Sequence, residues 1–321
     1  MGVLKIGSII LCNVYKKIDK GRKMKALKKA GGILEYTENA EIPKLNTINN
    51  ILVKVYYAGI CRTDCGVADG TIASTDGIIL GHEFCGIIEA TLTPHTEWKK
   101  GDCVMANPLL FGIERKEMCG KDCDGAFADF IAVPSIALVR ISPKMLGRLG
   151  AYIEPIAAAL APFDHIEKKQ DLRLAIFGNN RIASLTYHTA KYLGYDHVEN
   201  IKDAENMKAN AFDCIIETEA DSIDACVMGI RLGGMLVAKS RSFIPTKITL
   251  NDIVMKEIRI QGAKYADFNH AVEVAPTLID HIAADELWGD IFSLSEYQKA
   301  LAMAAKPQAK KIFFKINSCV E

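Results

Sequence analysis

The chain has no long apolar segment and no excess of charge of one sign. None of the apolar runs in its 321 residues approaches the roughly 20 residues that a transmembrane helix needs. Lys and Arg together number 39, and so do Asp and Glu, so the formal net charge is zero. Balanced charge gives no indication of binding to nucleic acid or to an anionic membrane. The sequence therefore predicts no membrane span and no nucleic-acid partner.

The chain also lacks the regular cysteine spacing of a disulfide framework and has no internal repeat. Its ten cysteines are scattered at positions 12, 61, 65, 85, 103, 119, 123, 214, 226 and 319. In a chain of this size, such scatter predicts reduced thiols in a cytoplasmic protein, with one or more bound to a metal. The hydrophobic content of 50% and charged content of 24% are typical of a globular protein, and the length suffices for two domains.

A group of possible metal ligands stands out against this background. Cys61 is followed, twenty-one and twenty-two residues later, by His82 and Glu83. A thiolate, an imidazole and a carboxylate suit a four-coordinate zinc ion better than magnesium or calcium. Glycines flank these positions, as expected where the backbone bends closely around an ion. In the alternative interpretation, Cys61 is a core residue while His82 and Glu83 form an ion pair.

Five segments in this order resemble the zinc-containing medium-chain dehydrogenases. They are residues 59–64, 81–86, 98–104, 124–130 and 154–157. The last, which begins Glu154-Pro155, is similar to the polyol and threonine dehydrogenase branch, where a Glu stands beside the zinc. The resemblance runs from about Met24 to the C-terminus. Residues 1–23, with an apolar stretch before a basic one, have the reverse order of a signal peptide. We interpret them as an N-terminal extension ahead of a true start at Met24.

The resemblance implies one catalytic zinc, held by Cys61, His82 and Glu154. Glu83 would lie beside the ion and exchange with water. Three protein ligands leave one position open, and a catalytic zinc lowers the pKa of an oxygen bound there. Thr63 would accept the proton of a substrate hydroxyl, although it could also be an ordinary turn residue. Asp64 is expected to orient the loop.

Two features of the family's chemistry are missing. The proton relay often continues through a His at the position of Gly66. A second, structural zinc is common in the family and is held by four cysteines in one loop. Here the loop 107–124 keeps only Cys119 and Cys123, and two thiolates do not close such a site. We therefore predict no structural zinc, with Cys103 and Cys119 as plain thiols.

The pattern of apolar residues predicts an α/β protein with two domains. From Met24 to about Lys144, short β-rich segments alternate with turns. After Ala151, strands and helices alternate, which is typical of a doubly wound parallel sheet. With the resemblance, this gives a GroES-like β-barrel catalytic domain at 24–154 and 269–321. A truncated Rossmann-like nucleotide-binding domain occupies 155–268.

The nucleotide-binding pattern is incomplete. The family's Gly-x-Gly-x-x-Gly is replaced here by Gly178, Asn179, Asn180, Arg181, Ile182 and Ala183. Asn180 brings a side chain to the place where backbone should approach a pyrophosphate. Spacing nominates Glu199 as the acid that binds the ribose. Thr218 and Lys239 complete the candidate cofactor residues.

The segment after Glu199 is short for this fold. Only ten residues separate Ile201 from the strand at Phe212, whereas a parallel crossover needs about a dozen. One strand–helix unit is therefore expected to be missing, and NAD(P) binding is predicted to be weak.

Two functions remain open from the sequence. The first is a zinc-dependent oxidoreductase that transfers a hydride between a small alcohol, polyol or amino alcohol and a nicotinamide cofactor. The second is a zinc enzyme on the same fold that has lost its dinucleotide and catalyses a non-redox step, such as elimination or hydration. A small-molecule substrate is expected in both. A homodimer formed through the sheet edge near Ile258 is also expected, because an exposed strand edge invites pairing.

Overall fold

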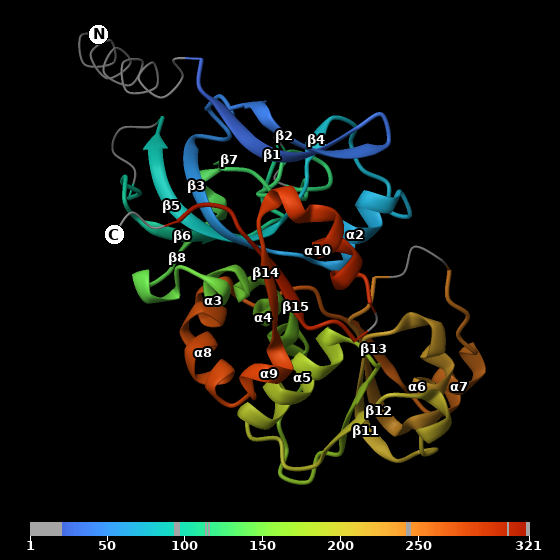
Figure 1. The fold of residues 1–321 in the computed structure, drawn as a ribbon. Helices are drawn as coiled ribbons and strands as arrows, with labels where there is room; N and C mark the ends of the chain where they lie inside the picture. Colours follow the sequence, from blue (N-terminus) through green and yellow to red (C-terminus); the bar gives the residue numbers. More distant parts are fainter. Residues whose placement is uncertain are drawn as a thin grey trace. The chain divides into compact units, whose positions relative to one another are not determined.

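The structure is a computed structural model that describes residues 21–92, 97–112, 114, 116–241, 245–306 and 308–318. It divides into two compact units (Figure 1). The first unit contains the chain up to Ile153 together with the segment from Trp288 onward, and the second runs from Glu154 to Leu287. Most of the predicted extension 1–23 lies outside the described residues. Lys23, at its end, is already the first residue of a strand.

The first unit is built from two sheets whose strands pair antiparallel, except that β14 and β15 pair in parallel. The smaller sheet has the order β2-β1-β4, and the larger has the order β14-β15-β3-β5-β6-β8, with β7 also paired to β3. The strands are β1 Lys23–Ala30, β2 Ile33–Glu41, β3 Ile51–Gly59, β4 Ile78–Ile79, β5 Glu83–Thr91, β6 Cys103–Ala106, β7 Phe130–Val133, β8 Leu138–Arg140, β14 Trp288–Phe292 and β15 Lys311–Lys315.

The pairing of β3 with β5 positions the candidate metal ligands. Both strands are rich in β-branched and aromatic residues, and most of their side chains are buried in the core of this unit. Gly59, the last residue of β3, lies opposite Glu83, the first residue of β5. Cys61 follows β3 and His82 precedes β5. The antiparallel register therefore brings residues that are distant in sequence to one end of this strand pair.

Short helices complete the first unit. They are α2 Arg62–Asp69, α3 Arg148–Ala151 and α10 Tyr297–Ala304. Helix α2 begins directly after Cys61 and ends at Gly70, whose left-handed backbone (φ 86°) is a common helix terminus. Its N-cap is therefore a candidate metal ligand, so the start of this helix determines where the thiol points.

The second unit contains a parallel sheet with the order β10-β9-β11-β12-β13. Its strands are β9 Leu174–Phe177, β10 Val198–Ile201, β11 Phe212–Glu217, β12 Ile230–Ala238 and β13 Arg259–Gly262. The helices are α4 Ile153–Leu160, which starts one residue before the unit, α5 Arg181–Tyr192, α6 Ile223–Gly229, α7 Leu250–Met255, α8 Phe268–Asp280 and α9 Ala284–Leu287. The central strands β9 and β11 are almost wholly buried, as expected for strands with both faces covered.

The connection between β10 and β11 contains no helix. It includes only a single 3-10 turn, Ala204–Asn206, in a place where parallel strands are usually joined by a helical crossover. The described sheet accordingly has five strands. Strand β10 is left at one edge, paired only with β9 in this sheet, and β13 forms the other edge.

The unit boundaries differ from the sequence-based expectation at residues 269–287. Those residues were assigned to the catalytic domain, but contacts place them in the second unit, where α8 packs against α5. No helix among the described residues is both long and apolar enough to cross a membrane.

Candidate metal centre and nucleotide turn

Three of the predicted metal ligands come together in the first unit. Ligand atoms of Cys61, His82 and Glu83 all lie within 4.8 Å of one another. His82 and Glu83 are each only 1% exposed, and Cys61 is half-buried. Sulfur, nitrogen and oxygen donors at this separation are the set that zinc prefers. The three side chains of the first unit thus have the donor types that a zinc site requires.

Asp64 holds two of these ligands in place. One carboxylate oxygen accepts a hydrogen bond from the backbone N–H of Cys61 at 2.8 Å, and the other lies 3.1 Å from Nδ1 of His82. Asp64 is itself 1% exposed. A carboxylate behind a metal-binding histidine fixes the ring orientation and leaves the other ring nitrogen for the ion. Nε2 of His82 is buried and meets no hydrogen-bond partner in the described part of the chain.

The electrostatics of this cluster attract a cation. Burial lowers the pKa of His82, but the Asp64 carboxylate and the Cys61 sulfur outweigh it, and the net pKa lies well above the ordinary value of 6.5. An imidazole that retains its proton so strongly is surrounded by negative charge. A zinc ion would take the place of that proton, so the residues present fit the metal.

Thr63 lies in the first turn of α2, beside the thiol. Its hydroxyl oxygen is 3.8 Å from the Cys61 sulfur. This places a proton acceptor next to the candidate centre. A role in proton transfer belongs to the proposal below.

A buried ion pair joins Glu83 to Lys311 at the start of β15. The side chains are 2% and 4% exposed, respectively, so this pair is almost completely removed from water. The Lys311 ammonium also lies over the Tyr152 ring, 5.8 Å from its centroid. Sequence reasoning assigned no role to Lys311. The available signal was a lysine that opens an apolar strand, Ile312 to Phe314, near the end of the chain.

Gly81 determines the path of the chain into His82. Its φ of +97° lies in the region that favours glycine, and a Cβ there would collide with the Phe127 ring. Phe127 is fully buried and packs edge-on against Phe314. A side chain at position 81 would therefore shift the histidine or the core.

The fourth candidate ligand, Glu154, belongs to the second unit. It is 5% exposed and accepts a hydrogen bond from the Tyr265 hydroxyl. Lys239 lies over the same tyrosine ring, 5.8 Å from its centroid, and donates to the carbonyl of Lys264 at 2.7 Å. Burial lowers the pKa of Lys239 to about 8, with the Glu154 charge acting in the opposite direction and Arg241 adding to the fall. The sequence predicts a metal-binding role for Glu154 and a cofactor-binding role for Lys239, and both roles stay proposals.

The turn after β9 is held by its own side chains. Gly178 has a φ of +135°, as the first glycine of such a turn requires. The next turn residue, Asn180, is the N-cap of α5, and its side-chain oxygen accepts from the backbone N–H groups of Ile182 and Ala183 at 2.9 and 3.0 Å. Its amide nitrogen donates to the carbonyl and hydroxyl oxygens of Thr218. The predicted intrusion of the Asn180 side chain is therefore a helix cap.

Glu219 is a member of this turn that sequence reasoning missed. One carboxylate oxygen accepts from the Asn179 backbone N–H at 2.9 Å and from the Asn180 side-chain amide at 3.0 Å. Glu219 is half-buried and lies two residues beyond the end of β11. Carboxyl ends of parallel strands meet at one edge of a sheet, which was the available signal.

The remaining nucleotide candidates have local roles. Glu199 lies inside β10 and forms an exposed ion pair with Lys208 at 3.1 Å. Arg181 is the first residue of α5. The Thr218 hydroxyl donates to the carbonyl of Phe177 at 2.8 Å, tying the end of β11 to β9.

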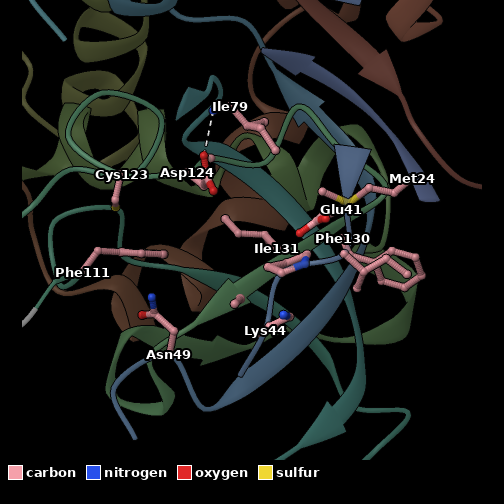
Figure 2. A pocket seen from close by; sticks show the side chains of 14 residues that line it. Met24, Glu41, Lys44, Asn49, Ile79, Phe111, Cys123, Asp124, Phe130 and Ile131 are labelled. Carbon is pink, nitrogen blue, oxygen red and sulfur yellow. Dashed lines mark hydrogen bonds between the residues drawn. The ribbon is translucent and has the colours of Figure 1, made fainter. Parts of the chain in front are cut away.

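A cavity of about 440 Å³ in the first unit is separate from the three clustered ligands, none of which lines it (Figure 2). Its wall includes Glu41, Cys123 and Asp124, and the Asp124 carboxylate accepts from the Ile79 N–H at 2.9 Å. Burial, with nearby acidic groups, raises the pKa of Cys123 to about 12. The absence of a structural zinc stays a prediction.

Comparisons with known proteins identify the family that the chain resembles. The model of the alcohol dehydrogenase GroES-like domain matches residues 47–143. Galactitol 1-phosphate 5-dehydrogenase of Escherichia coli K12 is 28% identical over 183 residues, which cover 53% of each protein. L-threonine 3-dehydrogenase of Bacillus velezensis is 24% identical, over 91% of this chain and 99% of that protein. The chain spans about half the length of the curated relatives it matches first.

Solved structures share the fold over nearly the whole chain. A zinc-binding dehydrogenase of Sinorhizobium meliloti, bound to NADP, superposes with a TM-score of 0.80 at 23% identity, covering 91% of this chain and 99% of that one. Galactitol-1-phosphate dehydrogenase of Escherichia coli gives a TM-score of 0.78 at 21% identity, with the same coverage. These findings confirm the resemblance to the zinc-containing medium-chain dehydrogenases and the predicted α/β fold class.

Proposed function

We propose that this protein is a zinc-dependent oxidoreductase that acts on a small alcohol, polyol or amino alcohol. The observation that supports this most directly is the buried cluster of Cys61, His82 and Glu83, with Asp64 behind it. Among the described residues, the buried Nε2 of His82 has no hydrogen-bond partner of standard geometry, and such a group is costly unless it binds something.

Each residue of the cluster has a role in this proposal. Cys61, His82 and Glu154 would hold the ion, and Glu83 would exchange with water beside it. A bound zinc supplies Lewis acidity, which makes a substrate hydroxyl easier to deprotonate. Asp64 accepts the Nδ1 proton of neutral His82, and this assigned tautomer leaves Nε2 as the donor atom.

Thr63 would accept the proton of the substrate hydroxyl. Its oxygen is next to the Cys61 sulfur. Gly66, which stands where the family often has a histidine, carries no side chain that could continue the relay. The proton would therefore pass from Thr63 to water or to the bound substrate and cofactor.

The relatives support the proposed substrate class. Those named above act, by their names, on galactitol 1-phosphate and L-threonine, and another group consists of D-xylulose reductases. Each named compound carries a hydroxyl or carbonyl beside another polar group. Oxidation of such a hydroxyl requires a hydride acceptor, for which we propose a nicotinamide cofactor. The non-redox alternative gains no support from these dehydrogenases and reductases.

A homodimer that forms through the edge strand β13 is part of the proposal. Ile260 on this strand is 48% exposed, and the preceding helix α7 exposes Leu250, Val254 and Met255 at 68–75%. Apolar side chains beside an unpaired strand edge favour pairing with a second copy. Sedimentation at micromolar concentration should give the dimer mass, whereas a monomer at all concentrations would contradict the dimer. A cytoplasmic location is also proposed, supported by eight free cysteines among the described residues.

Metal analysis tests the zinc site. Protein freed of adventitious metal should contain one zinc per chain, and Cys61→Ser or His82→Ala should remove it, because a two-ligand remnant holds zinc poorly. Cys65→Ser, one helical turn from Cys61, and His165→Ala are matched controls that should keep it. Stoichiometric zinc in the His82 variant would contradict the site. Two tightly held ions would refute the prediction that the loop 107–124 binds none.

Activity assays test the redox chemistry. Galactitol 1-phosphate and L-threonine should be offered with NAD⁺ or NADP⁺, and D-xylulose with the reduced cofactors. We expect turnover of at least one compound, which is lost in Cys61→Ser and kept in Cys65→Ser. A zinc-loaded protein that turns over none of these or related alcohols at millimolar cofactor would favour the non-redox function.

A further inference from the structure

The backbone donors at the start of α5 are already in use. In a dinucleotide-binding turn, N–H groups at the helix N-terminus face the diphosphate. Here the N–H groups of Ile182 and Ala183 donate to the Asn180 side chain, and that of Asn179 donates to Glu219. The Gly178 N–H donates to the carbonyl of Ile201 at 2.9 Å. A diphosphate would have to break such bonds to be recognised in the family's manner.

The group that takes the Asn179 donor is itself an anion. The Glu219 carboxylate accepts hydrogen bonds from the backbone and side chain of neighbouring turn residues, as a phosphate oxygen would. Nearby Glu217 is 1% exposed, and one of its carboxylate oxygens accepts a hydrogen bond from the Ser240 hydroxyl. Burial raises the pKa of Glu217, and the charge of Glu219 adds to the rise. A diphosphate would therefore approach a turn that already holds negative charge.

We propose that the Glu219 carboxylate is a built-in occupant of the diphosphate-binding turn, held there by Asn179 and Asn180, and that a dinucleotide binds only by displacing it. The turn as it stands does not fit the cofactor that the fold family implies. This inference rests on the proposed function, whose hydride acceptor it concerns. If Glu219 occupies the turn, the loss of binding affinity arises at the diphosphate, and the adenosine end of the ligand is unaffected.

Ligands with and without a diphosphate separate the two ends. ADP, adenosine, NADH and NADPH should be titrated calorimetrically into the full chain and into Glu219→Gln, which keeps the shape of the side chain and removes its charge. Glu273→Gln on α8 makes the same change at an exposed position and is the control. We expect Glu219→Gln to bind ADP and NADPH on the order of tenfold more tightly, because a like-charge contact is removed. Adenosine affinity and the control should be unchanged.

Two results would overturn the inference. One is a sub-micromolar Kd for NADH or NADPH in the unsubstituted protein. The other is a Glu219→Gln variant whose ADP affinity is unchanged, or rises no more than its adenosine affinity. Thermal melting should verify that the variant is folded. If it is not, Asn180→Gly opens the same turn at little capping cost, and it should show the same selective gain for ADP or the inference fails.

Failure of this inference and failure of the proposed function are distinguishable. Selective gain of ADP affinity in a protein that holds no zinc and oxidises no alcohol would contradict the function alone. Alcohol oxidation by the unsubstituted protein at low micromolar NADP⁺ would contradict the built-in carboxylate alone. The zinc content of Glu219→Gln should equal that of the unsubstituted protein, because its contacts lie in the second unit.

Discussion

The candidate metal centre and the nucleotide turn are both built from polar side chains at strand ends, but they differ in what they leave unsatisfied. At the metal centre, Asp64 binds one nitrogen of His82, while the other nitrogen is buried with no hydrogen-bond partner among the described residues. At the turn, Asn180 and Glu219 take up the backbone donors that a ligand would use. The first site is therefore prepared for a ligand, and the second is filled by the protein itself.

This difference shows that a family motif and a ready site are separate properties. Gly178 keeps the left-handed backbone of the fingerprint, yet the donors that follow it are engaged. Buried polar groups are normally satisfied, so one that is not marks a place for an external partner. The buried Nε2 of His82 thus supports the proposed metal site, and the engaged donors at the turn support the proposed closure of the diphosphate site.

The largest effect should come from breaking the buried ion pair beside the metal centre. Lys311→Met leaves the Glu83 carboxylate buried without its cation, which should lower the free energy of unfolding by about 3–5 kcal/mol. Lys310→Met, at the exposed neighbouring position, is the control. Denaturant unfolding measures both. A loss below about 1 kcal/mol for Lys311→Met would show that the pair is not buried in solution.

The next effect concerns the carboxylate behind the histidine. Asp64→Asn should weaken zinc binding by roughly 10–100-fold, because an uncharged amide has only one acceptor oxygen for the Cys61 N–H and the Nδ1 proton of His82. Competition with a chelator measures the affinity. Asp69→Asn, at the exposed end of the same helix, should have no effect. Equal zinc affinity in the two variants would remove Asp64 from its orienting role and weaken the contrast with the turn.

Removal of the α5 cap should have a smaller effect on stability. Asn180→Ala loses the side-chain bonds to Ile182 and Ala183 and should cost about 1 kcal/mol in urea unfolding. The exposed Asn206→Ala is the control. Zinc content should not change. A variant as stable as the unsubstituted protein would mean that the turn is not held closed by this side chain.

The smallest perturbation is chemical labelling at Lys239. With a pKa of about 8, this amine is about half neutral at pH 8, whereas an ordinary lysine is under about 1% neutral there. The neutral amine is the reactive form, so acylation at Lys239 should rise through pH 8 and level off above it. Mass spectrometry of the digest measures this, with the exposed Lys247 as internal control. A labelling profile that still climbs steeply above pH 9 would show that the ammonium is not desolvated.

Local sequence patterns were enough to predict most of the helices and strands. The strand at Phe212–Glu217 and the helix beginning at Arg181 fall where the apolar periodicity places them, because burial and the Asn180 cap are local signals. The edge strand near Ile258 also appears, as β13. The boundary near residue 269 shifted, since the packing of α8 against α5 is a tertiary contact that no local pattern encodes.

Within the sites, the spacing in the sequence predicted which ligands would cluster. It could not identify the side chains that bind to them. Cys61, His82 and Glu83 flank one antiparallel strand pair, so their meeting follows from topology. Lys311 reaches Glu83 from 228 residues along the chain, and its pairing depends on the register of β15 with β3. Glu219 likewise meets Asn179 only because β11 lies beside β9.

The cap that Asn180 provides at the start of α5 also affects how strongly the stability of this protein depends on a bound nucleotide. Where a helix start depends on a bound nucleotide for its hydrogen bonds, the stability of the folded protein rises with the concentration of that ligand. Here those bonds are made by Asn180 and Glu219, so the second unit is complete before any ligand arrives. Its abundance should therefore depend little on the NAD(P) pool, and millimolar cofactor should raise its melting temperature only by the small amount that weak binding supplies.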